Sequence, residues 1–433
     1  MEHGLDTEVL AVVAACVFLW GLVSLRFERA NITAPIAFVA LGLIVANGPL
    51  SLIDIDIGSA DGRAIAEVTL ALVLFADASR VNVRALRSDP GLPIRLLAVG
   101  LPLTIGLGTL AALVTFGGID PWIAAVIGAA VAPTDAALGA PIFEDRRVPG
   151  RIRRVLNVES GLNDGIATPF VTFFIVGAAE ATAHETTTLG SALVDLGIGA
   201  VVGVVAGVGG GMLLSFADRH GWGAPAFQRV AVGALALLAY AGAIELSGNG
   251  FVAVFIAGMA FGTALQRDDT KVLEFTDDAG TLLSLLVWFL FGAAMVVPAF
   301  EHARWADVAF ALLALTVVRM VPVAVSLVGS GLNTRTVAFI AWFAPRGLAS
   351  VIFALLAFDD LGSRDGFPVV AAITMTVLLS VIAHGATASP LARRYGRHAD
   401  RLPEGRAEHR SVDALRTRRH TRRAAGSAAE PVE

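Results

Sequence analysis

The chain has one cysteine, Cys16, and one lysine, Lys271, among 433 residues. A single cysteine excludes an internal disulfide and a cysteine-cluster metal site. Charge is scarce as well, since Asp, Glu, Lys and Arg make up 16% of the residues while hydrophobic residues make up 56%, and the mean hydropathy is +0.73. A soluble globular domain is far less apolar. We therefore expect an all-α polytopic membrane protein.

The sequence also lacks the usual constellations of enzymes. It shows no Ser-His-Asp, metal-hydrolase or phosphate-loop pattern, so we predict that the chain is not an enzyme and needs no cofactor. The glycine-rich run Gly207 to Gly211 lacks the strand, turn and helix context of a nucleotide-binding fingerprint. We interpret this run as a place of close helix packing.

Apolar runs long enough to cross a hydrocarbon core of ~30 Å occur about thirteen times. The first run follows a start without the basic region of a signal peptide, so we expect it to remain as a membrane helix. The predicted spans cover residues 8–25, 32–50, 64–79, 92–117, 121–142, 152–177, 187–216, 226–246, 249–265, 279–299, 305–330, 334–357 and 366–391.

Basic residues are distributed unevenly between the two sides of these spans. One set of alternate loops holds most of the arginines, and the other set holds only Arg63, Arg304 and Arg364. Because cytoplasmic loops are enriched in Lys and Arg, the amino terminus is predicted to lie outside and the carboxyl terminus in the cytoplasm. The Arg-rich tail, 393–433, is expected to be disordered and to lie near anionic lipid rather than to bind nucleic acid.

Two predicted spans share a feature that hydropathy alone does not reveal. Ala132-Pro133-Thr134-Asp135 and Ala344-Pro345-Arg346-Gly347 each place Ala-Pro and a charge near mid-membrane, an odd number of spans apart. Helices so placed run in opposite directions, as in the inverted-topology repeat of secondary transporters. Each proline predicts a broken helix, with Asp135 compensating half-helix N-termini and Arg346 half-helix C-termini. The alternative is that each proline only kinks a packed helix.

Ionisable and oxygen-bearing side chains gather on the span that covers 152–177. Helical spacing places Glu159 with Asn163, and Ser160 with Asp164, as i, i+4 pairs on adjoining faces. A carboxylate in mid-membrane is costly and usually marks an ion or proton path. Oxygen ligands suit a hard alkali cation.

These motifs together resemble a known family. Glu159-Ser160-Gly161-Leu162-Asn163-Asp164, with Thr134-Asp135 before it and Arg346-Gly347 after it, is similar to bacterial monovalent cation/proton antiporters of the sodium/hydrogen exchanger family, in the Asn-Asp, NhaP-like subgroup. The similarity in span order and motifs covers residues 8–391.

The resemblance implies a role for each residue of the motif. Asp164 would alternately bind the cation and the proton, with Ser160 and the Thr134 backbone as further ligands of the transported alkali cation. Asn163 stands where electrogenic relatives carry a second aspartate, which implies electroneutral exchange of one cation for one proton. Glu159 would form a buried ion pair at the edge of the cation site.

The partner that the resemblance implies for Glu159 is Arg346. It leaves open whether Asp77, in Phe75-Ala76-Asp77-Ala78, pairs with Arg319. For His384, near a helix end, we favour helix-dipole compensation or an interfacial place over a role as a pH sensor.

The resemblance also implies an arrangement in the membrane. Residues 1–80 and 221–300 would form a scaffold and dimer interface, 81–180 and 301–392 a moving transport core, and 181–220 a linker helix. A homodimer in the bacterial plasma membrane would then exchange Na⁺, or Li⁺ or K⁺, for H⁺ by alternating access.

Two other functions fit parts of the sequence. A cation channel or a K⁺/H⁺ efflux system could use the same fold, and coupled proton movement in vesicles would separate an antiporter from a channel. A proton-conducting subunit of a respiratory complex would carry lysines through successive spans, whereas Lys271 lies in a loop.

Overall fold

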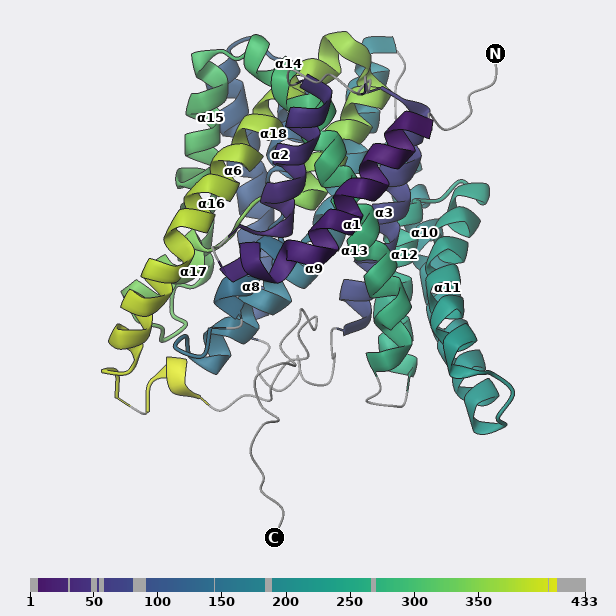
Figure 1. Ribbon diagram of the computed structural model, residues 1–433. Coiled ribbons are helices and arrows are strands. Elements are labelled where there is room, and N and C mark those ends of the chain that lie inside the picture. Colours follow the sequence, from purple (N-terminus) through teal and green to yellow (C-terminus); the bar gives the residue numbers. More distant parts are fainter. Residues whose placement is uncertain are drawn as a thin grey trace.

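The computed structural model describes residues 7–29, 32–47, 53, 58–80, 91–143, 145–183, 189–265, 270–403 and 405–410, and within these ranges all regular secondary structure is helical (Figure 1). The π-helical segments η1 (Leu96–Gly100) and η3 (Phe291–Met295) join α5 to α6 and α13 to α14, and the 3-10 helices are η2 (Thr270–Leu273) and η4 (Ala407–His409). The α-helices are α1 (Thr7–Arg29), α2 (Ala34–Asn47), α3 (Ala60–Arg80), α5 (Gly91–Arg95), α6 (Leu101–Phe116), α7 (Pro121–Ala130), α8 (Ala136–Phe143), α9 (Gly150–Ala183), α10 (Leu189–Arg219), α11 (Pro225–Glu245), α12 (Gly250–Ala264), α13 (Glu274–Leu290), α14 (Val296–Glu301), α15 (Trp305–Leu315), α16 (Val317–Ser326), α17 (Thr334–Trp342) and α18 (Leu348–Ala399).

Length and composition confirm a multi-pass membrane protein. Eight helices in the described part of the chain are long and apolar enough to cross a membrane, and three shorter apolar helices accompany them. The longest, α18, is two helices that meet at Gly362, whose φ of 70° is accessible mainly to glycine. The chain therefore folds back inside α18, at Gly362.

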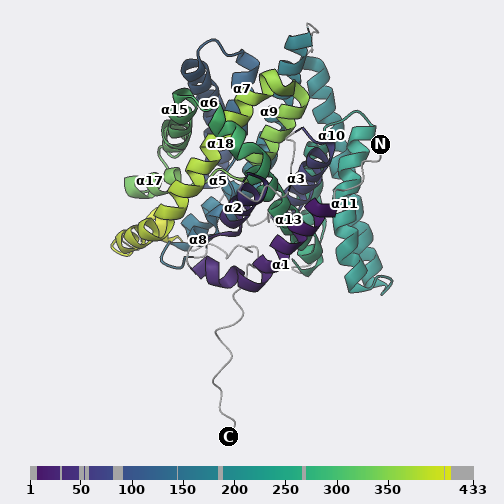
Figure 2. The same cartoon turned by 45° about the horizontal axis from the view of Figure 1, so that its top comes forward.

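The helices form two packing groups. In the first, α3 packs against α12 and α13, while α10 and α11 pack against α12. In the second, α6 packs against α7, α15 and α16, and α18 packs against α15, α7 and α9. Figures 1 and 2 show α10 and α11 at one edge of the molecule and α15 and α17 at the opposite edge. The contacts of α9 and α18 with α3 connect the two groups.

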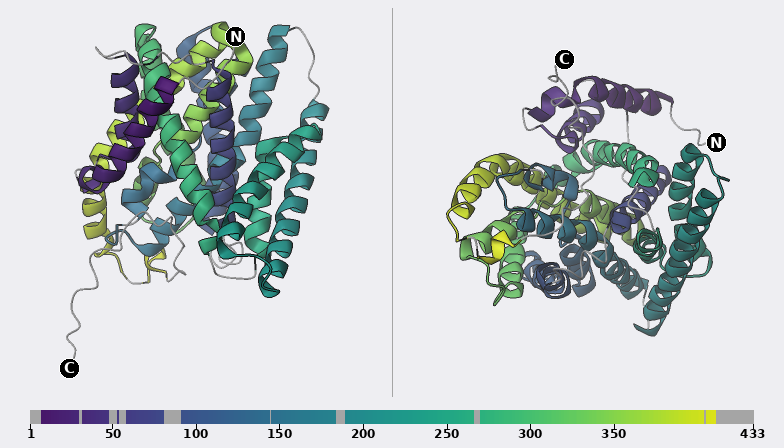
Figure 3. Two further views of the ribbon diagram at one scale, coloured as in Figure 1. Left: turned by 45° about the vertical axis from the view of Figure 1, so that its right-hand side comes forward. Right: turned by 90° about the horizontal axis from the view of Figure 1, so that it is seen from below.

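Helix α1 lies on the outside of this arrangement. It contacts α2 and α13 and keeps most of its apolar surface exposed. Seen from below, α1 and α2 form one margin of the bundle (Figure 3). In a membrane such a surface faces lipid or another protein, because it has no partner within the described chain.

The two interrupted helices that the prolines predicted are present. Helix α7 ends at Ala130 and α8 begins at Ala136, and α17 ends at Trp342 before α18 begins at Leu348. Each break contains its proline, Pro133 or Pro345, which has no amide hydrogen to continue a helical ladder. Kinked but continuous helices are therefore excluded at these two places.

The start of α7 shows how local sequence sets these elements. Asp120 precedes Pro121, and its Oδ1 accepts hydrogen bonds from Trp122 N at 2.8 Å and Ile123 N at 3.4 Å. An aspartate at the N-cap with proline as the first helical residue is a strong helix start. At the C-terminal end of α7, Val131 N donates to Ile127 O at 3.1 Å and Ala132 N donates to Ala129 O at 3.2 Å.

Small residues let α10 lie close to α12. A Cβ atom at Gly199 or Gly203 would lie 2.5 Å from the carbonyl oxygen of Asn249 or Ala253. Gly207 and Gly211 continue this face toward α12. The interpretation of the glycine-rich run as close helix packing is therefore confirmed at these positions.

The tail prediction is wrong for its first part. Helix α18 continues to Ala399, and Glu408 is buried, where its Oε1 accepts hydrogen bonds from Asn333 N at 2.7 Å and Thr336 Oγ1 at 2.9 Å. Arg151 Nη1 donates to Ala407 O at 2.6 Å. Composition favoured disorder for 393–410, but the continuation of α18 and the bonds of Glu408 at the N-terminus of α17 and of Ala407 to Arg151 order the described part of the segment. Residues 411–433 lie outside the described residues.

Burial and hydrogen bonding act on Glu408 in opposite directions. Burial raises its pKa, while the bonds from Asn333 N and Thr336 Oγ1 lower it, and the result is a pKa below the ordinary value. The docking of this segment is therefore complete at neutral pH and weakens only in acid, as the pH falls through the lowered pKa.

The close approach of α10 and α12 makes a prediction. Gly203→Ala should destabilise the protein by about 1–3 kcal/mol, because the new methyl group meets backbone that cannot move aside. Gly209→Ala is the matched control, since a Cβ there meets nothing within 4 Å. Thermal unfolding in detergent measures both, and equal melting temperatures for the two variants would contradict the packing account.

Candidate functional site

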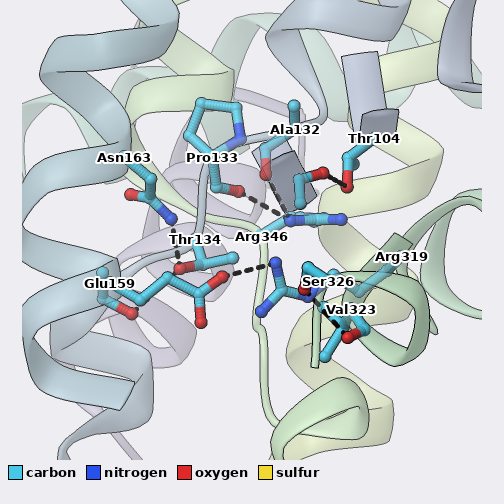
Figure 4. Close-up of polar contacts among 12 residues, drawn as sticks. Thr104, Ala132, Pro133, Thr134, Glu159, Asn163, Arg319, Val323, Ser326 and Arg346 are labelled. Carbon is cyan, nitrogen blue, oxygen red and sulfur yellow. Dashed lines mark hydrogen bonds and ion pairs between the residues drawn. The ribbon is translucent and has the colours of Figure 1, made fainter. Parts of the chain in front are cut away.

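A buried group of hydroxyl and amide side chains lies where the break between α7 and α8 meets α9. Asn163 Nδ2 donates to Thr134 Oγ1 at 2.6 Å, and Thr134 Oγ1 lies 2.9 Å from Ser160 Oγ (Figure 4 shows the first contact). All three side chains are buried. Asn163 Oδ1 is also buried and accepts no hydrogen bond from any described residue. The structure thus brings together the three oxygen-bearing residues that the sequence nominated.

Asp164 is on the same helix, one turn beyond Ser160, and it is half-buried. Its backbone carbonyl accepts a hydrogen bond from Thr168 Oγ1 at 2.6 Å. The predicted i, i+4 spacing of Ser160 and Asp164 therefore holds, because α9 is helical throughout this stretch. Carboxylate, hydroxyl and amide oxygens are ligand types that suit a hard alkali cation.

The two chain breaks are bonded directly to each other. Asp135 N donates to Pro345 O at 2.7 Å, and Asp135 Oδ2 accepts from Leu348 N, the first amide of α18, at 2.9 Å. Asp135 Oδ1 accepts from Leu138 N, at the start of α8, at 2.9 Å. One carboxylate therefore serves the N-terminal ends of two half-helices, which is the placement expected for Asp135. Gly347 permits this approach, since a Cβ there would collide with the Asp135 side chain.

Arg346 hydrogen-bonds the backbone that directly follows the C-terminal end of α7. Its side chain is fully buried, and its Nη1 donates to Ala132 O at 2.7 Å and to Pro133 O at 3.0 Å (Figure 4). These carbonyls follow the end of α7 and have no helical partner. The placement of Arg346 at a half-helix C-terminus agrees with the expectation from sequence.

The expected ion pair between Glu159 and Arg346 is wrong. Glu159 Oε1 instead lies 2.6 Å from Nη1 of Arg319, and both side chains are buried (Figure 4). Arg319 comes from α16, which restarts after Thr316, a residue with φ −110° and ψ −90°. Nη1 of Arg346 donates to carbonyls, and the second mid-membrane arginine, Arg319, supplies the charge that Glu159 requires.

The resemblance left open whether Asp77 pairs with Arg319, and in the structure the partner of Arg319 is Glu159. Asp77 lies 3.6 Å from Arg80 on its own helix, and Arg80 also bonds Asp277 of α13. The ion pair of Arg80 with Asp277 joins α3 to α13. The sequence did carry a signal for the Glu159–Arg319 pair. Arg319 lies in mid-span, where an arginine needs a carboxylate partner.

Comparison with known proteins agrees with this geometry. The profile of the transmembrane sodium/hydrogen exchanger family matches residues 12–394 of the chain. The chain belongs to this family. The family is one of transporters rather than enzymes, and the resemblance drawn from the motifs is confirmed.

Curated relatives of this exchanger-family chain carry related names. It is 28% identical over 389 residues to the K(+)/H(+) antiporter NhaP of Alkalimonas amylolytica, which covers 88% of this chain and 66% of the relative. It is 26% identical over 391 residues to the K(+)/H(+) antiporter NhaP2 of Shewanella sp. (strain MR-4), with the same shares. The chain thus spans just under two thirds of the length of these relatives.

The fold is shared with a solved structure. The sodium proton antiporter MjNhaP1 from Methanocaldococcus jannaschii superposes with a TM-score of 0.74 at 21% sequence identity, covering 90% of this chain and 99% of that one. At this identity the likeness establishes the fold. A second relative from the same organism, a probable Na(+)/H(+) antiporter, is 25% identical over 300 residues, which is 62% of this chain and 69% of that protein.

The buried ion pair makes a prediction about stability. Arg319→Ala should destabilise the folded protein by about 3–5 kcal/mol, because it leaves the Glu159 carboxylate buried without its partner. Adding Glu159→Gln should recover part of that loss. Arg229→Ala, in the exposed pair with Glu274, is the control and should change stability by about 1 kcal/mol or less.

A double-mutant cycle by thermal unfolding in detergent measures the coupling. Strict additivity of the Arg319 and Glu159 changes would mean that the two residues do not interact. The same cycle with Arg346 in place of Arg319 should give the weaker coupling, since the structure bonds Arg346 to carbonyls.

Proposed function

We propose that the chain is a secondary antiporter that exchanges a monovalent cation for a proton by alternating access. The observation that carries the proposal is the position of Asp164, half-buried on α9 one turn from the hydroxyl of Ser160 and next to the amide of Asn163, within a chain of the exchanger family. Such a carboxylate can hold either a proton or a cation, with neighbouring oxygens as further ligands.

Coupling follows from competition at one carboxylate. When Asp164 is protonated it has lost the charge that attracts a cation, and when it binds a cation the proton is excluded. Each face of the membrane then loads whichever species prevails there. Glu159 and Asp135 have other tasks, because Arg319 holds the first and backbone amides hold the second.

Electroneutral exchange follows from the same charge count. With Asn163 beside Asp164, one carboxylate of the motif titrates, so the proton-loaded and cation-loaded states carry equal charge. The membrane potential then does no work on the transport cycle. The proposed ligands of the cation are Asp164, Ser160 and Thr134, with the buried Oδ1 of Asn163 beside them.

The movement we propose follows the two packing groups. The group of α6, α7, α9, α15 and α18 would move as a core against the group of α3, α11, α12 and α13, with α10 as the linker. We retain about thirteen spans related by an inverted repeat, with the amino terminus outside and the tail in the cytoplasm of a bacterium. We propose that the exposed apolar face of α1 contributes to the interface of a homodimer.

Na⁺ and K⁺ are the two main candidates for the transported cation. The relatives named above are K⁺/H⁺ antiporters and a probable Na⁺/H⁺ antiporter. We propose Na⁺ first, with K⁺ as the alternative, and a comparison of Na⁺, K⁺ and Li⁺ on the same vesicles separates them.

Asp164→Asn should abolish exchange while the protein remains folded, because asparagine keeps the volume and polarity of the side chain but cannot carry a proton. Glu245→Gln is the control, since this carboxylate is exposed at the end of α11 and should be dispensable. Proteoliposomes with an imposed pH gradient are challenged with each cation in turn. Normal collapse of the gradient by the Asp164 variant would refute the assignment, and cation flux without proton movement in the wild type would indicate a channel.

A further inference from the structure

His384 lies in the second half of α18, and its ring contacts Trp342, at the end of α17, and Ser380, on its own helix. Its Nε2 lies 2.8 Å from the carbonyl oxygen of Trp342, the last residue of α17. Its Nδ1 lies 3.1 Å from Ser380 Oγ and 2.8 Å from Ser380 O. Both side chains are buried, and the ring packs against Trp342 with centroids 5.3 Å apart.

Ser380 connects His384 to Arg346, which lies within the break between α17 and α18. Its Oγ accepts a hydrogen bond from Arg346 N at 2.7 Å, so its own hydroxyl proton is available for His384 Nδ1. With the ring proton on Nε2, Arg346 N donates to Ser380 Oγ, Ser380 Oγ donates to Nδ1 and Nε2 donates to Trp342 O, whereas a proton on Nδ1 is donated to Ser380 O. The pair of His384 and Ser380 thus links the end of α17 to Arg346, inside the break.

The same arginine leads to the candidate site. Arg346 Nη1 holds the carbonyls of Ala132 and Pro133, which directly precede Thr134. Thr134 in turn bonds Ser160 and Asn163. A contiguous series of buried contacts therefore runs from Arg346 to Thr134, Ser160 and Asn163.

We propose that His384 is a positioning residue for cation binding, acting through Ser380 and Arg346 on the break that carries Thr134. The proposal rests on the proposed function, because it assigns a role to His384 in the same site. His384 does not touch the cation. Its effect resembles that of the outer partners of metal ligands, whose loss typically costs 10–100-fold in metal affinity.

The test compares the cation KM and maximal rate of exchange in four variants. His384→Phe keeps a ring beside Trp342 but loses both nitrogens, and Ser380→Ala removes the link to Arg346; each should raise the KM about tenfold. His384→Gln restores a donor for Trp342 O and should recover part of the affinity. Thr376→Val is the matched control, since this buried hydroxyl on α18 bonds only its own helix, at Ala372 O, and its KM should not change.

The outcomes separate a positioning role from a structural one. If His384→Phe lowers only the melting temperature and the yield, and the folded protein keeps the wild-type KM, the proposal is overturned. If the KM effects of His384→Phe and Ser380→Ala multiply in the double variant, the residues do not form one chain, which also overturns it. Absence of exchange in the wild type would instead refute the proposed function, and it is recognised before any variant is compared.

Discussion

The mutual bonding of two chain breaks is the constraint on which the rest of the structure depends. A helix interrupted inside a membrane exposes backbone groups that lipid cannot satisfy, so non-helical backbone persists there only where protein satisfies it. Here each break supplies what the other requires. Asp135 accepts the first amide of α18 and donates its own amide to Pro345, while Arg346 donates to the carbonyls that follow α7. Because every one of these bonds crosses between the breaks, neither break can shift independently, and Thr134 is placed by both.

The buried charges follow from this arrangement. Arg346 Nη1 donates to carbonyls, and Glu159 has its cationic partner on α16 instead of in the break that holds Arg346. Asp135 is committed to two helix N-termini. These assignments separate charges that hold the fold from a charge that can change during transport. Within the proposed mechanism that charge is on Asp164, on the face of α9 that also carries Ser160. Stability and transport then reside in different carboxylates, which allows one to titrate without unfolding the others.

Sequence alone predicted much of this, and its errors have physical causes. Prolines 133 and 345 predicted the two breaks, and the charge next to each predicted which helix ends it would serve, because these effects act within a few residues. The partner of Glu159 depends instead on how α16 approaches α9 in space. Two mid-membrane arginines were both suitable, and spacing along the chain does not distinguish them. The docking of the segment around Glu408 was missed because composition averages over many residues, whereas the docking depends on particular contacts such as the bond from Asn333 N to Glu408. His384 was placed at a helix end, but its link to Arg346 requires two halves of α18 to fold back at Gly362.

The central claim is that one carboxylate exchanges one cation for one proton, and charge counting tests it most directly. A pulse of the transported cation over proteoliposomes on a supported membrane gives the net charge moved, and an internal pH dye gives the protons moved in the same preparation. One uncompensated charge per turnover would make the rate respond to a potential worth ~2.3 kcal/mol per 100 mV. The account predicts proton movement with no sustained current and no response to voltage. A steady current in proportion to the protons moved would show that Glu159 or Asp135 also titrates, and would contradict the separation of structural and transporting charges.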